Sequence, residues 1–179
     1  MCRAPAGFVF LLLALMAALP RPVAAQEEIY RLDAGDLVKI QVFREPELDR
    51  DLRIGANGTI SYPLTGEVKA AKLTTRELEE AIASRLRGPF LANPKVTVTI
   101  VEYRPFYVNG EVEKPGSYPY QPGLTVRKAV TLAGGFKERA SMNKIFLIKA
   151  DNTVAGSVRV ELDTPIGPGD VLTVEQSFF

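Results

Sequence analysis

The sequence predicts an α+β fold made of two small domains. Short runs of apolar and β-branched residues recur along the chain, and two segments show the spacing of apolar residues typical of amphipathic helices. Glycine, proline and asparagine separate these runs at short intervals, as turns between strands require. The order strands, helix, strands occurs twice, which favours two consecutive units of similar size.

The first 25 residues have the features of a secretory signal peptide. They combine a basic start at Arg3, an apolar run over 8–19, and small residues at Val23 and Ala25. The apolar run is shorter than the roughly 18 residues that a membrane-spanning helix needs. We therefore expect residues 1–25 to be removed during export, which leaves 154 of the 179 residues.

Cysteine and charge narrow the class of the mature chain. The single cysteine, Cys2, precedes the apolar run, whereas the acylated cysteine of a lipoprotein follows it, so we expect no lipoprotein and no disulfide. Of the 22 Lys and Arg residues, Arg3 and Arg21 lie in the signal peptide, which leaves 20 against 21 Asp and Glu. This balance argues against nucleic acid as a partner, because nucleic-acid-binding proteins carry a concentrated basic surface.

The first predicted domain, residues 26–104, begins with a turn at Ala34-Gly35-Asp36 and an apolar strand over 37–43. Two further strand runs in LRIGANGTISYPLTGEV are separated by Asn57-Gly58, the preferred centre of a tight hairpin. Asn57-Gly58-Thr59 also matches a glycosylation sequon, but the hairpin already explains it.

The clearest helix lies in LTTRELEEAIASRLRGPF. Thr74 can cap its start, and Glu77 can complete a capping box three residues later. Gly88-Pro89 ends it. The strand KVTVTIVEY follows, because its valines and threonines alternate between two faces. The apolar face of the helix consists of Leu78, Ile82 and Leu86.

The predicted boundary is Arg104-Pro105, since the residue before a proline is extended or turning. The second domain, residues 105–179, starts with the strand FYVNGEV, turns through Lys114-Pro115-Gly116 and resumes at SYPY. We expect Gly116 to supply the backbone freedom of this turn.

A second helix is predicted in LTVRKAVTLAGG, capped by Thr125 and ended by Gly134-Gly135. KIFLIK and DVLTVEQ supply later strands. The segments AGDLVKIQV and PGDVLTVEQ both place Gly-Asp before an apolar strand. This echo indicates one local device used twice, in which an aspartate accepts bonds from backbone N–H groups. The apolar face of the second helix consists of Val126, Ala129, Val130 and Ala133.

The residues available for chemistry are few. With no histidine in the chain and no cysteine after residue 25, nucleophilic triads and His-ligated metals are excluded from the mature chain, so we expect no enzyme, no cofactor and no metal. Ser141 and Lys144 fit an S-x-x-K pattern, but its partner motifs are missing, and a solvated loop explains them.

Neighbouring carboxylates are common: Asp33 and Asp36, Asp49 and Asp51, Glu79 and Glu80. We interpret Asp36 as fixing its turn and Glu79-Glu80 as a solvated helix face.

Aromatic residues gather near the predicted boundary between the domains, and aromatic faces are common in carbohydrate sites. Because side chains of a strand alternate between its faces, some of these rings must belong to the core. No catalytic residue is predicted, and the sequence does not identify which residues would bind a substrate. Phe178 and Phe179 end the chain and are expected to pack in the core, against a partner or against lipid. The cluster consists of Tyr103, Phe106, Tyr107, Tyr118 and Tyr120.

The order and spacing of these motifs resemble the bacterial polysaccharide export family. The segments YRLDAGDLVKIQVFREPEL, ANGTISYPLTGEVKAAKLTTRELEEAIASRL and NPKVTVTIVEY resemble its export-domain signature. FYVNGEVEKPGSYPYQPGLTVRKAVTLAGG resembles the soluble-ligand-binding β-grasp (SLBB) module, with VNGEVEKPGSYPY as its hairpin. The resemblance covers nearly all of residues 29–175. It implies an N-terminal polysaccharide-export α/β domain and a C-terminal SLBB-like β-grasp domain.

The resemblance also implies a function, namely transport of capsular polysaccharide or exopolysaccharide across the periplasm and outer membrane. Family members form rings that conduct the polymer and work with an inner-membrane polysaccharide co-polymerase or chain-length regulator. This sequence has one β-grasp module where larger members have several, and no amphipathic C-terminal helix. We therefore expect a homo-oligomer associated with the outer membrane that docks to a separate outer-membrane pore protein. The alternative is a monomeric periplasmic protein that binds a glycan or a small ligand.

Overall fold

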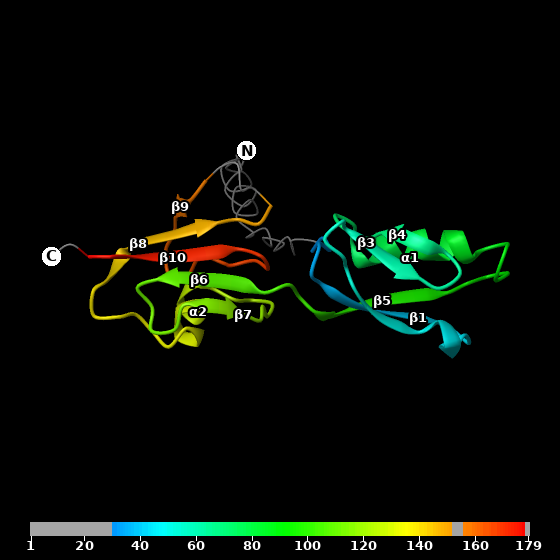
Figure 1. The fold of residues 1–179 in the computed structure, drawn as a ribbon, viewed down its shortest axis with the longest axis horizontal. Helices are drawn as coiled ribbons and strands as arrows, with labels where there is room; N and C mark the ends of the chain where they lie inside the picture. Colours follow the sequence, from blue (N-terminus) through cyan, green and yellow to red (C-terminus); the bar gives the residue numbers. More distant parts are fainter. Residues whose placement is uncertain (1–29, 152–155, 178–179) are drawn as a thin grey trace, which may run out of the picture.

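The computed structural model describes residues 30–151 and 156–177. The predicted signal peptide and the terminal pair Phe178 and Phe179 lie outside the described residues. Figure 1 shows two lobes placed end to end along the longest axis of the molecule, each with its own sheet and helix. The predicted α+β fold with two small domains is confirmed. Among the helices of the described part, none is both long enough and apolar enough to span a bilayer.

A three-stranded antiparallel sheet organises the first domain. β1 (Leu37–Val42) is central, with β2 (Arg50–Arg53) on one side and β5 (Val96–Glu102) on the other. A 3-10 helix, η1 (Pro46–Leu48), leads from β1 to β2. A separate hairpin consists of β3 (Thr59–Tyr62) and β4 (Gly66–Lys69).

The hairpin predicted at Asn57-Gly58 is wrong in its strand pairing. The dipeptide does form a turn, in which the Gly58 N–H donates to the Gly55 carbonyl at 2.8 Å. However, this turn joins β2 to β3, which belong to different sheets. The Gly58 carbonyl accepts the N–H groups of Ala70 and Ala71 at 2.9 Å each, so the turn is held by the segment after β4. The antiparallel hairpin lies one strand later.

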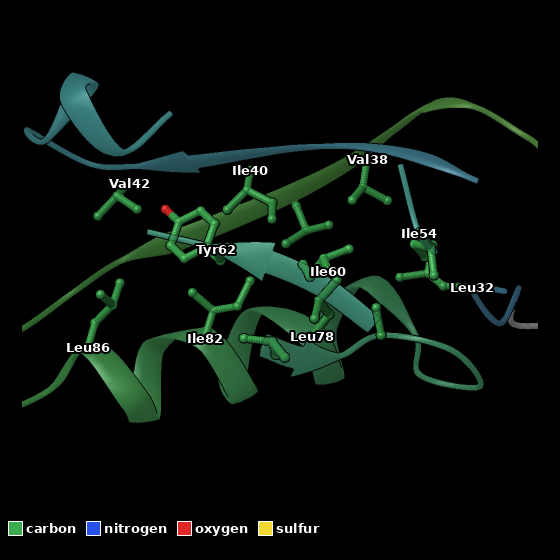
Figure 2. Packing of buried hydrophobic residues seen from close by; sticks show 13 residues of the cluster. Leu32, Val38, Ile40, Val42, Ile54, Ile60, Tyr62, Leu78, Ile82 and Leu86 are labelled. Carbon is green, nitrogen blue, oxygen red and sulfur yellow. The ribbon is translucent and has the colours of Figure 1, made fainter. Parts of the chain in front are cut away.

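Helix α1 (Thr75–Leu86) begins as the sequence predicts. The Glu77 N–H donates to Thr74 Oγ1 at 3.1 Å, and the Thr74 N–H donates to Glu77 Oε2 at 2.8 Å, which is a complete capping box. The four-residue apolar repeat of α1 is fully buried. Figure 2 shows this repeat pointing toward the apolar side chains of β1, with Ile60 and Tyr62 of β3 between them. These layers form the first hydrophobic core.

The second domain contains a five-stranded mixed sheet in the order β7-β6-β10-β8-β9. β6 (Phe106–Gly110) and β7 (Gly116–Tyr118) form the predicted hairpin, and β10 (Val171–Gln176) lies parallel to β6. β8 (Ala140–Ile148) and the short β9 (Val158–Arg159) complete the sheet. Helix α2 (Val126–Leu132) buries its predicted apolar face in this domain's core. A hairpin, a crossing helix and a central parallel strand are the β-grasp arrangement.

The predicted side-chain cap of helix α2 is wrong. Thr125 is the N-cap residue of α2 but makes no side-chain cap bond. Instead, Val126 and Arg127 donate their N–H groups to the carbonyls of Thr164 and Leu162, at 3.0 and 2.8 Å. A neighbouring segment therefore satisfies the start of the helix with backbone groups, and the threonine side chain is not needed.

Of the two glycines in the β6–β7 hairpin, Gly110 is the one that requires unusual backbone freedom, whereas the sequence indicated Gly116. Gly110 has φ +85°, and a Cβ placed on it would lie 2.0 Å from the Val174 carbonyl oxygen. Gly116 has no heavy atom within 4 Å of the corresponding position. The close approach of β6 to β10, which no local pattern encodes, decides which glycine is irreplaceable.

The S-x-x-K segment is also reassigned, since Ser141 and Lys144 lie within strand β8 rather than in a solvated loop. The register between β8 and β10 explains why this strand was not predicted from the sequence. Val174 faces Ile145, but Gln176 faces Ala140, so β8 contains an irregular stretch opposite the end of β10. An irregular strand lacks the strict alternation from which a strand is predicted.

Candidate functional site

Two Gly-Asp turns, one in each domain, have the same hydrogen-bond pattern. In the first, the Asp33 N–H donates to Asp36 Oδ2 at 2.9 Å, and in the second the Gly167 N–H donates to Asp170 Oδ2 at 2.8 Å. The N–H of each aspartate returns to the carbonyl of the same partner, at 3.2 and 3.3 Å. Both aspartates are buried. The echo in the sequence is therefore one structural device used twice, and Asp36 fixes its turn as predicted.

The linker between the domains is held between these two turns. The Arg104 N–H donates to Asp36 Oδ1 at 2.7 Å, across 68 positions of sequence. On the other side, the Gly169 N–H donates to the Pro105 carbonyl at 3.0 Å. Each turn thus binds one of two consecutive linker residues. We call Arg104, Pro105 and the two turns the junction.

The Arg104 side chain fills the centre of the junction. Its guanidinium Nη1 lies 2.9 Å from the Tyr30 hydroxyl and 3.4 Å from Asp36 Oδ2, and its side chain is only 12% exposed. Its Nε would lie 2.8 Å from a Cβ placed on Gly169, whose φ is +85°. Because Gly169 has no side chain, Arg104, which is bound to the first turn, can also lie against the second turn.

Burial and a hydrogen bond keep the Tyr30 hydroxyl protonated. Burial, followed by the hydrogen bond that its hydroxyl donates to Asp36, raises the pKa of Tyr30 far above its ordinary value of 10.0. The phenol therefore remains a donor to the carboxylate at physiological pH. The Tyr30 hydroxyl and the Arg104 guanidinium both donate hydrogen bonds to the Asp36 carboxylate, which has no access to solvent.

A second polar contact connects the domains at Lys72. Burial acts to raise the pKa of Asp33, but hydrogen bonds from Lys72 Nζ and the Ala34 N–H outweigh it and lower that pKa below 3.8. The hydrogen bond to Asp33 raises the pKa of Lys72 above 10.5. Lys72 Nζ lies 2.7 Å from Asp33 Oδ2 and 3.4 Å from Asp151 Oδ1 of the second domain.

A groove of about 500 Å³ lies beside the junction, with walls from both domains. The second domain supplies the segment Ser117–Gln121, and Pro105 lies between the walls. In the first-domain wall, Arg53 and Glu102 both oppose Leu37 in the register of the sheet, and they form an ion pair at 2.6 Å. The first-domain wall consists of Arg53, Val101, Glu102 and Tyr103.

The aromatic cluster predicted near the boundary separates into three groups. Phe106 is core, and Tyr107 is 43% exposed outside the groove. Tyr103, Tyr118 and Tyr120 are half-buried on the groove walls. The Tyr103 ring meets Tyr30 and Tyr120 edge to face, with centroids 5.0 and 5.3 Å apart. Sequence reasoning found these rings without assigning them to a site.

Arg53 and Glu102 were not anticipated as site residues. They come from β2 and the end of β5, and only the pairing of both strands with β1 brings them together. No signal in the local sequence marks either residue.

The paired carboxylates of helix α1 have structural roles. Glu79, expected on a solvated face, accepts the Val98 N–H at 2.8 Å, while Glu80 pairs with Arg76 at 3.4 Å. Within the described ranges, no cluster of three or more acidic, His or Cys side chains could hold a metal ion.

A second hollow, of about 430 Å³, lies between residues 43–45 and 91–95 of the first domain. Phe43 is 65% exposed there, with Arg44 and Lys95 over its ring at 5.1 and 5.9 Å. This hollow uses one domain only. The groove at the junction, which both domains build, is therefore the stronger candidate site.

Comparison with known proteins identifies two family models in consecutive order. The model described as polysaccharide biosynthesis/export protein matches residues 24–101, and the SLBB domain model matches residues 105–161. Together they cover the sheet and helix of the first domain and the first part of the second.

Three curated relatives are similar to most of this chain. They are the exopolysaccharide production protein ExoF of Rhizobium meliloti (37% identical over 142 residues), the EPS I polysaccharide export outer membrane protein EpsA of Ralstonia nicotianae (28% over 189) and the polysialic acid transport protein KpsD of Escherichia coli (24% over 133). The alignments cover 72, 87 and 73% of this chain, but 34, 49 and 24% of the respective relatives. The chain therefore spans between a quarter and a half of the length of these proteins.

Proposed function

The chain belongs to the polysaccharide export family, and from this membership we propose that it is a non-catalytic subunit of a machine that exports capsular polysaccharide or exopolysaccharide. The observation that carries the proposal is the order of the two matched domains, export domain then SLBB domain. Three relatives named for polysaccharide production, export or transport support it, since each is similar to 72–87% of this chain. The division into residues 26–104 and 105–179 is part of the proposal.

The proposed mechanism is conduction of the polymer through an oligomer in the periplasm at the outer membrane. A ring of identical subunits needs two different, complementary faces on each subunit. The two edge strands of the first sheet have different chemistry, since β2 reads RDLR and β5 reads VTVTIVE. In the part of the chain that the structure describes, each of these edge strands has a strand neighbour on one side only, and edge strands are ready sites of association. These edges support a ring but leave the number of subunits open.

The proposed partners follow from the position of such a ring. The polymer is the substrate, an inner-membrane polysaccharide co-polymerase or chain-length regulator delivers it, and a separate outer-membrane pore protein receives it. No bond of the polymer is made or broken by this chain. Its contribution is a passage and a docking surface.

Deletion of the gene, with surface polysaccharide measured separately in the periplasm and in the medium, tests the proposal. We expect polymer or precursor to be retained inside the cell and lost from the medium, and plasmid-borne wild-type protein to restore secretion. Unchanged secretion in a strain without a second exporter would contradict the export role.

The oligomeric state distinguishes the export subunit from the alternative, a monomeric periplasmic protein that binds a glycan or a small ligand. Light scattering coupled to size-exclusion chromatography of the purified chain, over a range of concentrations, measures it directly. A ring subunit gives a defined oligomer at high concentration. A monomer at every concentration, with secretion unaffected by deletion, favours the binding protein.

A further inference from the structure

The groove at the junction combines aromatic rings with planar polar side chains. We propose that it is a binding subsite for a short run of pyranose units of the exported polymer, with Tyr103 and Tyr120 as its main contacts. This inference rests on the proposed export function and deepens it, because it locates one place where the polymer touches the chain.

The chemistry of a pyranose matches the two kinds of side chain in the groove. One face of the sugar ring presents C–H groups, which pack on the electron-rich face of an aromatic ring. The hydroxyls at its rim need planar partners: a guanidinium donates hydrogen bonds, a carboxylate accepts them, and an amide does both. Arg53 and Glu102 supply the first two on one wall, and Gln121 supplies the third on the other.

The size and position of the groove fit a chain-like ligand. Its volume of about 500 Å³ lies within the range of small-molecule sites, which occur preferentially between domains. The Arg53–Glu102 pair is about half exposed on both sides, at 53 and 57%. A ligand can therefore replace water around this pair without breaking a buried interaction.

The rings in the groove are held in place by contacts outside it. Tyr103 packs edge to face against Tyr30, whose hydroxyl is bound to Asp36 at 2.6 Å. The Tyr118 hydroxyl donates to the Lys114 carbonyl, and its ring lies 5.9 Å from that of Phe106. Preorganised rings lose little conformational entropy on binding, which favours recognition of a weakly interacting sugar.

The two walls belong to different domains, so the junction sets the width of the groove. The Tyr103 and Tyr120 rings, one from each wall, are in edge-to-face contact with centroids 5.3 Å apart, while Arg104 binds the first turn and approaches Gly169 of the second. A change in domain orientation moves one wall relative to the other. Binding should therefore depend on the junction even though Arg104 does not line the groove.

Titration of the full chain with oligosaccharides tests the inference directly. The probe is the set of oligomers released by partial acid hydrolysis of the polymer that the host secretes, and binding is followed by calorimetry and by NMR shifts of the tyrosine rings. We expect Tyr103→Ala and Tyr120→Ala to weaken binding by about tenfold each, as loss of an aromatic anchor does. Gln121→Ala, at an exposed position, should weaken it less without affecting folding.

Tyr107→Ala is the matched control, because Tyr107 is an exposed tyrosine that lies in the same domain as Tyr120 but outside the groove. It should bind as the wild type does. Thermal unfolding of each variant separates lost binding from lost folding, and Tyr103→Phe should retain binding because it keeps the ring. Wild-type affinity in the Tyr103→Ala and Tyr120→Ala variants, or no binding by wild-type protein at millimolar oligomer, overturns the subsite.

Complementation separates this inference from the export role. If deletion blocks secretion and the Tyr103→Ala, Tyr120→Ala double variant restores it fully, the export role stands and the subsite is wrong. If deletion leaves secretion unchanged, the export role itself is wrong. We expect deletion to block secretion, and the double variant to restore it only in part while Tyr107→Ala restores it fully.

Discussion

The backbone N–H of Arg104 donates to the carboxylate of Asp36 at 2.7 Å, so the residue that leaves the first domain is bound to the turn with which that domain begins. The same carboxylate accepts the Tyr30 hydroxyl and the Asp33 N–H, at 2.6 and 2.9 Å. One buried side chain thus organises both the first turn and the exit of the chain. The first prediction concerns this side chain.

Asp36→Asn should destabilise the first domain by about 2–4 kcal/mol, because the amide turns one acceptor of a buried network into a donor that faces other donors. Urea unfolding of the full chain measures the loss. Asp163→Asn is the control, since Asp163 is 86% exposed in its pair with Arg127, and it should change stability by less than about 0.5 kcal/mol. Equal effects of the two substitutions would contradict the assigned role of Asp36.

Gly110→Ala should destabilise the second domain by about 3 kcal/mol or more, because its φ is positive and its Cβ position overlaps the Val174 carbonyl. Gly116→Ala should be close to neutral, since the position is open. Thermal unfolding of both variants decides between the structural assignment and the one expected from sequence. A larger loss for Gly116→Ala would show that the hairpin turn matters more than the β6–β10 contact.

Tyr30→Phe should reduce stability at neutral pH by about 1 kcal/mol, the usual worth of one hydrogen bond. Since the pKa of Tyr30 is raised in the folded state, the contribution of its hydroxyl is complete below pH 10.0 and decreases as the pH rises above that value. The difference between wild type and variant should therefore narrow in alkaline solution. Tyr107→Phe, at an exposed position, should change stability little at neutral pH, and a constant difference for Tyr30→Phe would contradict the bond to Asp36.

Lys72→Met should lower stability only within a defined pH window, and by less than about 1 kcal/mol, because Lys72 is well exposed. The lowered pKa of Asp33 means that its contribution is complete above pH 3.8 and is lost as the pH falls further. The raised pKa of Lys72 means that its contribution is complete below pH 10.5 and is lost above it. Denaturant titrations at several pH values measure this window, and Lys72→Arg, which keeps the charge, should retain most of the effect.

Arg104→Ala should leave both domains folded but loosen their relative orientation. The backbone bond to Asp36 remains available in the variant, whereas the contacts of the guanidinium with Tyr30 and Asp36 are lost. We expect a loss of about 1–3 kcal/mol, since a buried carboxylate loses a charged partner. Residual dipolar couplings for the two domains measure their orientation, with Arg127→Ala as an exposed control. A fixed orientation in Arg104→Ala would show that the backbone bonds alone hold the junction.

Much of the fold could be predicted because its signals are local. The capping box of Thr74 and Glu77 and the four-residue repeat of α1 use residues within one or two helical turns. The Gly-Asp echo was readable because each turn closes within four residues, from Asp33 to Asp36 and from Gly167 to Asp170.

Contacts between segments that are distant in the sequence were decided only by the tertiary structure. Asn57-Gly58 specifies a turn, but the pairing of β2 with β1 determines that the turn is not a hairpin centre. The identity of the critical glycine depends on how closely β10 approaches β6. Arg53 and Glu102 become neighbours only because β1 pairs with both of their strands. Helix ends and turns depend on neighbouring residues, so a short window of sequence encodes them. The order of strands in a sheet and the close approach of one strand to another depend on burial of the whole core, which involves residues far apart in the sequence.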